Sequence, residues 1–194
     1  HPEMLLDTTD LVCISGGVPL DLPLLQAAGQ RGIPITNDAQ LFVERCPAPI
    51  IGITGSAGKT TTTTLVGDMV RRAGYRTHVG GNIGDVLLDE LNDIQPDDCV
   101  VMELSSFQLD VMTSSPQVGA VLNVTPNHLD RHKTMEAYVR AKSNMIRFQQ
   151  SSDIAVLGMD DPAARSLEAL VIGELVAFSA REMVPNGAFL TGSR

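Results

Sequence analysis

Residues 55–60 read GSAGKT and directly follow an apolar segment, the composition of a loop that binds phosphate groups. The glycines at 55 and 58 let backbone N–H groups approach an anion closely. Lys59 is placed to reach the outer phosphates of a nucleoside triphosphate, and the Thr60 hydroxyl to bind magnesium. The helix expected from about Thr60 adds the positive end of its dipole. The strict phosphate-loop motif has a further glycine at the position that is Ile53 in this chain. The alternative interpretation is therefore a glycine-rich turn that happens to precede a helix.

Further positions fit the same nucleotide site. We expect ATP and Mg²⁺ to be the ligands of this loop. The residues expected to contact them are Ser56, Ala57, Gly58, Lys59, Thr60, Thr61 and Thr62. Glu103 follows the apolar residues 99–102 and would lie at the end of a neighbouring strand, where a second protein ligand of magnesium is expected. The alternative role for Glu103 is that of a solvated carboxylate at a strand end.

Two more candidates carry less information on their own. Residues 128–132 read HLDRH after an apolar strand, which makes His128 a candidate ligand of a second divalent ion. An ordinary polar loop explains the same residues, and spacing alone favours that alternative. Lys142 falls on a helix expected from Thr134, where most lysines are solvated, and nothing in its spacing singles it out.

The bulk composition limits the partners of such a site. The 194 residues carry a net charge of −9 and a pI near 4.8, which argues against binding nucleic acid. No apolar run is long enough for a membrane span. Cys13, Cys46 and Cys99 form no metal motif and cannot all pair, which indicates a reducing, cytoplasmic environment. Because the chain begins with His1 and has no leader, we expect a piece of a longer protein.

Short elements are expected in the first part of the chain. Residues 11–14 and 33–35 have the apolar composition of short strands. Residues 22–28 suit a helix, and Asp38 can cap another that runs to about Arg45. A proline-rich connector follows at 46–49, where we place a domain boundary.

From residue 50 onward, apolar strands alternate with amphipathic helices. Strands are expected at 50–54, 77–79, 99–104, 118–124 and 154–157, and helices at 60–73, 85–91 and 134–148. This alternation predicts an α/β fold, in which a mostly parallel sheet is flanked by helices. Ligands of such sheets bind at the carboxyl ends of the strands, where the candidate residues above would lie. After Ser179 the pattern weakens.

Several of these segments resemble the Mur ligases. The resemblance extends to about Leu157, and its motifs are residues 51–60 (IGITGSAGKT), 80–84 (GGNIG), 103–109 (ELSSFQL) and 123–130 (NVTPNHLD). Residues 15–21 and 33–42 are similar to the end of the family's UDP-binding domain. The resemblance implies that a Rossmann-like UDP-binding domain ends at residue 47. It also implies that residues 48–194 are a P-loop, ATP-binding central domain, incomplete at its C-terminal end, so that the isolated chain would be weakly active or inactive.

The resemblance also implies a reaction. The ELSSFQL block favours the family member that joins D-glutamate to UDP-N-acetylmuramoyl-L-alanine (UDP-MurNAc-L-Ala) in cytoplasmic peptidoglycan synthesis, which serves cell shape and division. ATP would convert the substrate carboxylate into an acyl phosphate, which the amine of D-glutamate then attacks. The partners would be small molecules, and the complete enzyme is expected to be a monomer with no membrane span.

Roles for single residues follow from the same resemblance. It implies catalytic roles for Lys59, His128 and Lys142, and two magnesium ions held by Thr60, Glu103, His128 and Lys142. Lys142 matches a family lysine that carbon dioxide carbamylates, which turns a cation into an anion able to bind or orient the second metal. Substrate contacts are implied for Gly17, near the uridine, and for Asn82, Ser105 and Ser106, on the muramoyl-alanine side.

The chain departs from the family pattern at two places. Ser56 and Ala57 stand where Thr-Asn is common, which leaves any contact of that Asn side chain in doubt. Residues 15–17 read SGG where the family has Ser-Pro-Gly. Other functions therefore stay open: another Mur ligase, a ligase similar to folylpolyglutamate synthase, or a P-loop ATPase that binds nucleotide without making a bond.

Overall fold

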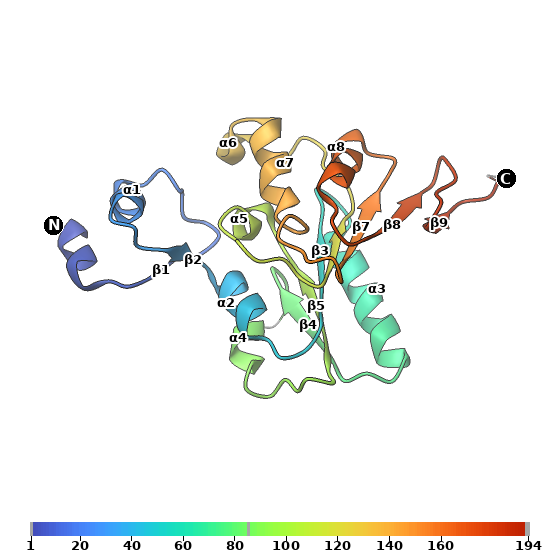
Figure 1. Ribbon diagram of the computed structural model, residues 1–194, viewed down its shortest axis with the longest axis horizontal. Coiled ribbons are helices and arrows are strands. Elements are labelled where there is room, and N and C mark those ends of the chain that lie inside the picture. The colour runs from blue at the N-terminus through green and yellow to red at the C-terminus, as the bar shows by residue number, and fades with distance from the viewer. Residues whose placement is uncertain (1, 85, 193–194) are drawn as a thin grey trace.

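A parallel sheet of seven strands forms the centre of the molecule, in a computed structural model that describes residues 2–84 and 86–192 (Figure 1). The strand order is β4-β5-β3-β6-β7-β8-β9, and every neighbouring pair is parallel. The strands are β3 (Ile50–Thr54), β4 (Thr77–Gly81), β5 (Cys99–Glu103), β6 (Val118–Val121), β7 (Ile154–Gly158), β8 (Glu174–Ser179) and β9 (Gly187–Phe189). The predicted α/β class with a parallel sheet is confirmed.

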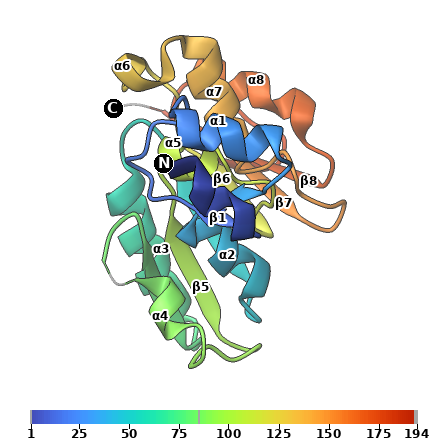
Figure 2. The same ribbon diagram turned by 90° about the vertical axis from the view of Figure 1, so that its left-hand side faces the viewer.

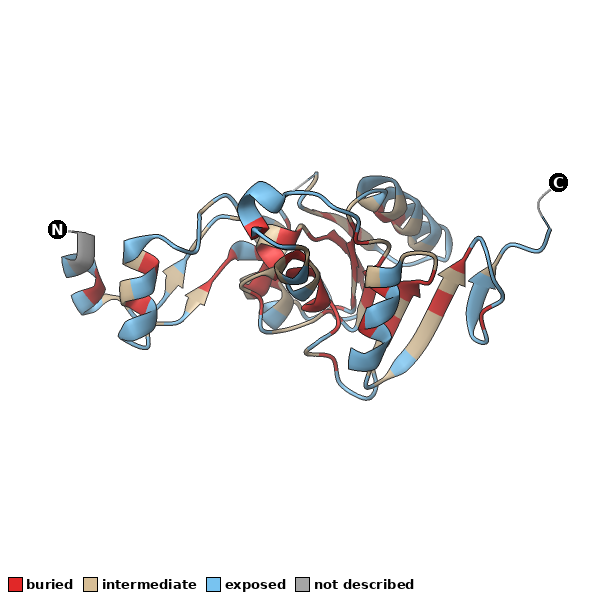
Figure 3. Cartoon of the chain, turned by 90° about the horizontal axis from the view of Figure 1, so that it is seen from above, coloured by how far each residue is buried: buried red, intermediate tan, exposed pale blue. Residues whose placement is uncertain are grey.

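Helices cover both faces of this sheet. On one face, α3 (Lys59–Arg72) packs Val66 and Val70 against a small cluster centred on Ile53 and Val101. The other face carries the larger core, beneath α2 (Asp38–Arg45), α4 (Leu87–Glu90), α5 (Ser106–Leu109), α7 (Met135–Ser143), α8 (Pro162–Ser166) and η2 (Leu167–Leu170). In Figure 2, α3 lies at the left and α2, α7 and α8 lie to its right, while α4 overlaps α3 in this view. In Figure 3 the buried residues gather in the sheet and on the inner sides of these helices.

The N-terminal unit, residues 2–36, lies at one end of the molecule (Figure 1). It consists of η1 (Pro2–Thr8), β1 (Val12–Cys13), α1 (Pro23–Gln30) and β2 (Ile35–Thr36), and its two strands pair in parallel. Helix α2 follows directly and buries Ala39 and Phe42 in the larger core of the central sheet. The domain boundary at residues 46–49 stays a prediction.

The predicted helix over 134–148 is too long. Helix α7 ends at Ser143 because the Ser115 hydroxyl donates to the Asn144 carbonyl (2.7 Å) and accepts from the Phe148 N–H (3.0 Å). In a continuing α-helix these two backbone groups would bond to each other. A side chain from a distant loop thus ends the helix, which no local pattern reveals.

Other boundaries also differ from the prediction. Strand β6 stops at Val121 instead of residue 124, because Asn123 and the residues after it turn to contact the phosphate loop. The predicted strand at 33–35 lies at Ile35–Thr36 instead. The predicted helix over 85–91 is seen as α4, and Asp85 lies outside the described residues. Elements not predicted are η1, α5, α6 (Leu129–His132), α8, η2, β8 and β9.

Candidate functional site

The phosphate loop connects β3 to α3 at the carboxyl edge of the sheet. Gly58 adopts φ +83°, a left-handed conformation that favours glycine, and this turn starts α3 at Lys59. Within the described residues, the backbone N–H groups of Lys59, Thr60 and Thr61 have no hydrogen-bond acceptor. The ammonium of Lys59 forms no ion pair there either. A helix start of this kind can accept an anion.

Asn123 fastens the first half of the same loop. Its side-chain oxygen accepts from the N–H of Ser56 (3.0 Å) and of Ala57 (2.9 Å), and its amide donates to the Ala57 carbonyl (3.1 Å). Asn123 therefore occupies two backbone N–H donors in the first half of the loop. The donors that remain for a phosphate group are those in the second half. Sequence reasoning assigned Asn123 no role. A polar residue directly after an apolar strand, at the ligand edge of the sheet, was the available signal.

Glu103 lies next to the start of α3. Its Oε2 accepts from the Thr60 hydroxyl (2.8 Å), and its Oε1 accepts from the Asn82 amide (2.9 Å). The carboxylate is only 1% exposed, and strand register places Ile53 and Gly81 on either side of it. The sheet thus brings together three of the predicted site residues, Thr60, Asn82 and Glu103, from three different segments.

The close approach of β4 to Glu103 requires a glycine. Gly81 has φ +105°, and a Cβ atom there would lie 2.3 Å from the Glu103 carbonyl oxygen. The Asn82 N–H donates to that same carbonyl at 2.8 Å. Because any side chain at position 81 would push the two strand ends apart, this glycine fixes the position of Asn82.

Lys142 lies beneath the phosphate loop and is 1% exposed. Its ammonium donates to the Gly55 carbonyl (3.0 Å) and the Thr54 hydroxyl (3.2 Å), and it lies 4.9 Å from the centre of the Tyr138 ring. Burial lowers the pKa of Lys142 to about 7, and repulsion from Lys59 adds to this, while Glu103 opposes it. At neutral pH much of this lysine is therefore an uncharged amine, which is a nucleophile.

His128 and the serines of α5 occupy different surroundings. His128 is exposed, has φ +53°, and its ring meets Phe107 edge-on at 5.2 Å. Ser105 caps α5 in a reciprocal pair with Gln108. Ser106 is buried, and its hydroxyl lies 2.9 Å from His132 Nε2. Among the residues the structure describes, no three His, Cys, Asp or Glu side chains gather as a metal cluster, so the site for a second metal stays a prediction.

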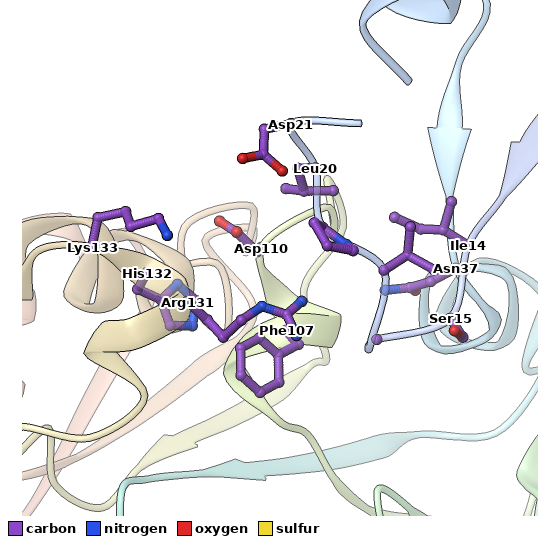
Figure 4. A pocket seen from close by; sticks show the side chains of 13 residues that line it. Ile14, Ser15, Leu20, Asp21, Asn37, Phe107, Asp110, Arg131, His132 and Lys133 are labelled. Atoms are coloured by element: carbon purple, nitrogen blue, oxygen red, sulfur yellow. The ribbon is translucent and has the colours of Figure 1, made fainter. Parts of the chain in front are cut away.

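A cavity of about 390 Å³ separates the N-terminal unit from the central sheet (Figure 4). Residues of the segment 14–21 line one wall, and Phe107, Asp110, Arg131, His132 and Lys133 line the other. Arg131 joins the two walls, because its Nη2 donates to the Gly17 carbonyl (2.9 Å) while its guanidinium lies 5.1 Å from the Phe107 ring centre. Burial lowers the pKa of His132 and raises the pKa of Asp110. Gly17, the predicted substrate residue, accepts the hydrogen bond from Arg131 but does not itself line the cavity.

No helix of the described part of the chain is long and apolar enough to cross a membrane. Cys13, Cys46 and Cys99 form no disulfide among the described residues.

Comparison with known proteins links these features to a family. A model described as the Mur ligase middle domain matches residues 53–183, more than half of the chain. A UDP-N-acetylmuramoylalanine–D-glutamate ligase of Symbiobacterium thermophilum is 48% identical over 172 residues, which cover 89% of this chain and 38% of that protein. The ligase of the same name from Pelotomaculum thermopropionicum is 45% identical over 193 residues, which cover 99% of this chain and 42% of that protein. The chain thus spans about two fifths of the length of these relatives.

Solved structures share the fold. A UDP-N-acetylmuramate:L-alanyl-γ-D-glutamyl-meso-diaminopimelate ligase from Neisseria meningitides matches 95% of this chain and 65% of its own, with a TM-score of 0.59 and 18% identity. The MurF ligase from Thermotoga maritima, solved in complex with ADP, matches 91% of this chain and 49% of its own, with a TM-score of 0.58 and 18% identity. With the family model covering the phosphate loop and most of the sheet, the chain belongs to the Mur ligase family.

Proposed function

We propose that this chain is the nucleotide-binding part of an ATP-dependent ligase that joins D-glutamate to UDP-MurNAc-L-Ala in the cytoplasm. The observation that carries the proposal is the cluster of Thr60, Asn82 and Glu103 beside a phosphate loop with unpaired backbone donors. Relatives that bear the name of this reaction are 43–48% identical to the chain, which supports the choice of D-glutamate over the amino acids of other Mur ligases.

The residues around Thr60 fit a magnesium ion. Magnesium prefers oxygen ligands and usually combines one or two carboxylates with water and substrate phosphates. The Thr60 hydroxyl and the Glu103 carboxylate already lie 2.8 Å apart, so both oxygens face one point next to the loop. A bound ion would neutralise charge on the phosphate oxygens. Lys59 and the N–H groups of residues 59–61 would bind the phosphates of ATP, with Ser56, Ala57, Gly58 and Thr62 completing the loop.

Lys142 is suited to carbamylation. A carbamate forms when an uncharged amine attacks carbon dioxide and loses a proton, and a lysine with a pKa of about 7 supplies that amine. The product would carry a negative charge where the lysine ammonium now donates to Gly55 and Thr54. It would therefore attract cations, and it is proposed to hold a second magnesium ion together with His128.

The cavity between the two walls is the place proposed for the UDP-muramoyl substrate. Arg131, His132 and Lys133 provide donors for an anionic ligand, and the exposed loop of residues 15–17 offers backbone groups. The substrate carboxylate would then reach the phosphate loop near Asn82, Ser105 and Ser106. Attack on the γ-phosphate gives an acyl phosphate, and the amine of D-glutamate displaces phosphate from it.

The proposal is tested with the complete protein that carries this chain. Purified protein is given MgATP, UDP-MurNAc-L-Ala and D-glutamate, and the amide product is measured by mass spectrometry. Lys59→Ala should abolish product and weaken MgATP binding, while the control Arg72→Ala, which changes an exposed cation at the far end of α3, leaves MgATP binding unchanged. Turnover of a folate substrate instead of the muramoyl nucleotide would favour a folylpolyglutamate synthase-like ligase. ATP hydrolysis without any acceptor dependence would favour a P-loop ATPase.

A further inference from the structure

We propose that Tyr138 is a positioning residue that links the cavity to the phosphate loop, so that a ligand in one site changes the affinity of the other. This inference rests on the proposed function and adds a coupling between its two substrate sites. The link runs from His132, in the cavity wall, through Tyr138 to Ser56, in the loop. These three residues are not consecutive in the sequence, so the fold brings them together.

The cavity end of the link is a stacked pair of rings. His132 lines the cavity, is 8% exposed, and lies parallel to the Phe107 ring with their centres 5.2 Å apart. Its Nε2 is held 2.9 Å from the Ser106 hydroxyl. A ligand that contacts Phe107 or His132 from the cavity would therefore displace the imidazole toward the residue packed behind it, because buried side chains leave little free space.

That residue is Tyr138, whose ring centre lies 5.1 Å from the His132 ring. Tyr138 is 1% exposed, and its hydroxyl lies 3.0 Å from Ser56 Oγ. The Ser56 hydroxyl also lies 2.9 Å from the Thr125 carbonyl, to which it donates its single proton. The Tyr138 hydroxyl must then be the donor to Ser56. Burial raises the pKa of Tyr138, which keeps that proton in place.

The loop end of the link has two attachments. Ser56 Oγ additionally accepts from the Thr125 N–H (3.0 Å), so the Tyr138 hydroxyl meets the point where the phosphate loop is fastened to residues 123–125. One helical turn further along α7, Lys142 lies over the Tyr138 ring and donates to the Gly55 carbonyl. A movement of one ring is thus transmitted to both Gly55 and Ser56, at the start of the loop.

Two ligands test the link in the full chain. MgADP reports on the phosphate loop, and UDP-MurNAc-L-Ala fills the cavity. We expect the second ligand to change the Kd of MgADP by a factor of about 5 or more. Tyr138→Phe removes the hydroxyl bond to Ser56 but keeps a ring beside Lys142, so it should bring that factor closer to 1. The matched control is Tyr75→Phe, because Tyr75 is the only other tyrosine and is 56% exposed. It should keep the wild-type factor.

A second arm needs MgADP alone. His132→Ala and Tyr138→Phe are combined in a double-mutant cycle, and the changes in MgADP affinity should be non-additive by a factor of about 2 or more. If Tyr138→Phe does not fold, Ser56→Ala takes its place, because it removes the same hydrogen bond from the other end, together with the two bonds between Ser56 and Thr125. Additive changes in the cycle would overturn the link.

The outcomes separate the link from the proposed function. If both ligands bind, yet Tyr138→Phe or its replacement keeps the wild-type coupling factor, the link is wrong and the proposed function stands. The same holds if the wild type shows no coupling. If the muramoyl nucleotide fails to bind, the proposed function fails, and the double-mutant cycle alone decides the link. If MgADP fails to bind, both fail.

Discussion

Glu103, the proposed metal ligand, combines a negative charge and two hydrogen bonds in one buried side chain. Glu103→Gln keeps the size of the side chain and an oxygen for Thr60, but it removes the charge that a divalent ion requires. We expect the Kd of ATP in the presence of Mg²⁺ to rise about tenfold or more, and binding measured without Mg²⁺ to change much less. Isothermal titration calorimetry with and without the metal measures both values.

The control for this change is Glu174→Gln, an exposed carboxylate at the start of β8. It alters the net charge of the protein by the same amount but lies at the opposite edge of the sheet from the loop. Equal losses of affinity in the two variants would mean that overall charge, and not a metal ligand, explains the result.

Lys142 should react with carbon dioxide in a pH-dependent way. With a pKa of about 7, roughly half of its amines are uncharged at pH 7, against about one in three thousand for an ordinary lysine. The uncharged fraction rises with pH, so carbamate formation should increase steeply through pH 7 and level off above it. Carbon-13 NMR with labelled bicarbonate should show one carbamate signal that Lys142→Arg abolishes. Survival of that signal in the variant would assign it to another amine.

The residues predicted from sequence were those with a recognisable motif. The loop of 55–60 and Glu103 lie where strand ends were expected to bring them together, because parallel strands place their carboxyl ends at one edge. Asn123 and Tyr138 received no role, since their importance depends on contacts with a residue 67 positions away for Asn123 and 82 positions away for Tyr138. The low pKa of Lys142 likewise comes from burial, which its position on a helix does not reveal.

At the scale of elements, the end of β4 can lie close against β5 because Gly81 has no side chain. Gly81→Ala would place a Cβ against the Glu103 carbonyl and require an alanine at φ +105°. We expect a loss of about 1–3 kcal/mol in the free energy of unfolding, together with weaker MgATP binding, because Asn82 moves with the strand end. Urea denaturation and calorimetry measure the two effects.

Gly29→Ala is the matched control for this change. Gly29 lies in α1, and a Cβ there meets nothing within 4 Å. Because alanine favours helices by about 1 kcal/mol over glycine, this variant should be as stable as the wild type or more so. A comparable loss in both variants would contradict the proposed role of Gly81.

The strands were easier to predict than the ends of the helices. Residues 50–54 form β3 as expected, since an unbroken apolar run in an α/β protein suits a strand buried on both faces. Helix α7 ends early because Ser115 interrupts its hydrogen bonds, and α5 is a single turn that begins with a capping box. Such features depend on tertiary contacts or on very few residues, so periodicity alone does not predict them.

At the scale of the whole molecule, cationic groups gather at one edge of an acidic protein. The net charge is −9, yet the phosphate loop contains Lys59 and lies above Lys142, and Arg131 and Lys133 line the neighbouring cavity. This local arrangement would let a protein of negative net charge bind the anionic small molecules proposed as its ligands. The sequence predicts this arrangement for the loop but not for the cavity, whose walls come from residues 14–21 and 107–133, over eighty positions apart.

Expressed alone, the 194 residues should bind MgATP without joining the two substrates. Everything proposed to hold the triphosphate lies within residues 55–103, which the central sheet positions. However, Ala57, Gly58, Thr60 and Thr61 are exposed, so water would reach an acyl phosphate formed at the loop. This chain spans about two fifths of the length of the relatives named for this reaction. Calorimetry should therefore detect MgATP, whereas mass spectrometry after incubation with UDP-MurNAc-L-Ala and D-glutamate should find no amide. Accumulation of the amide would show that these residues alone exclude water and bind the amine.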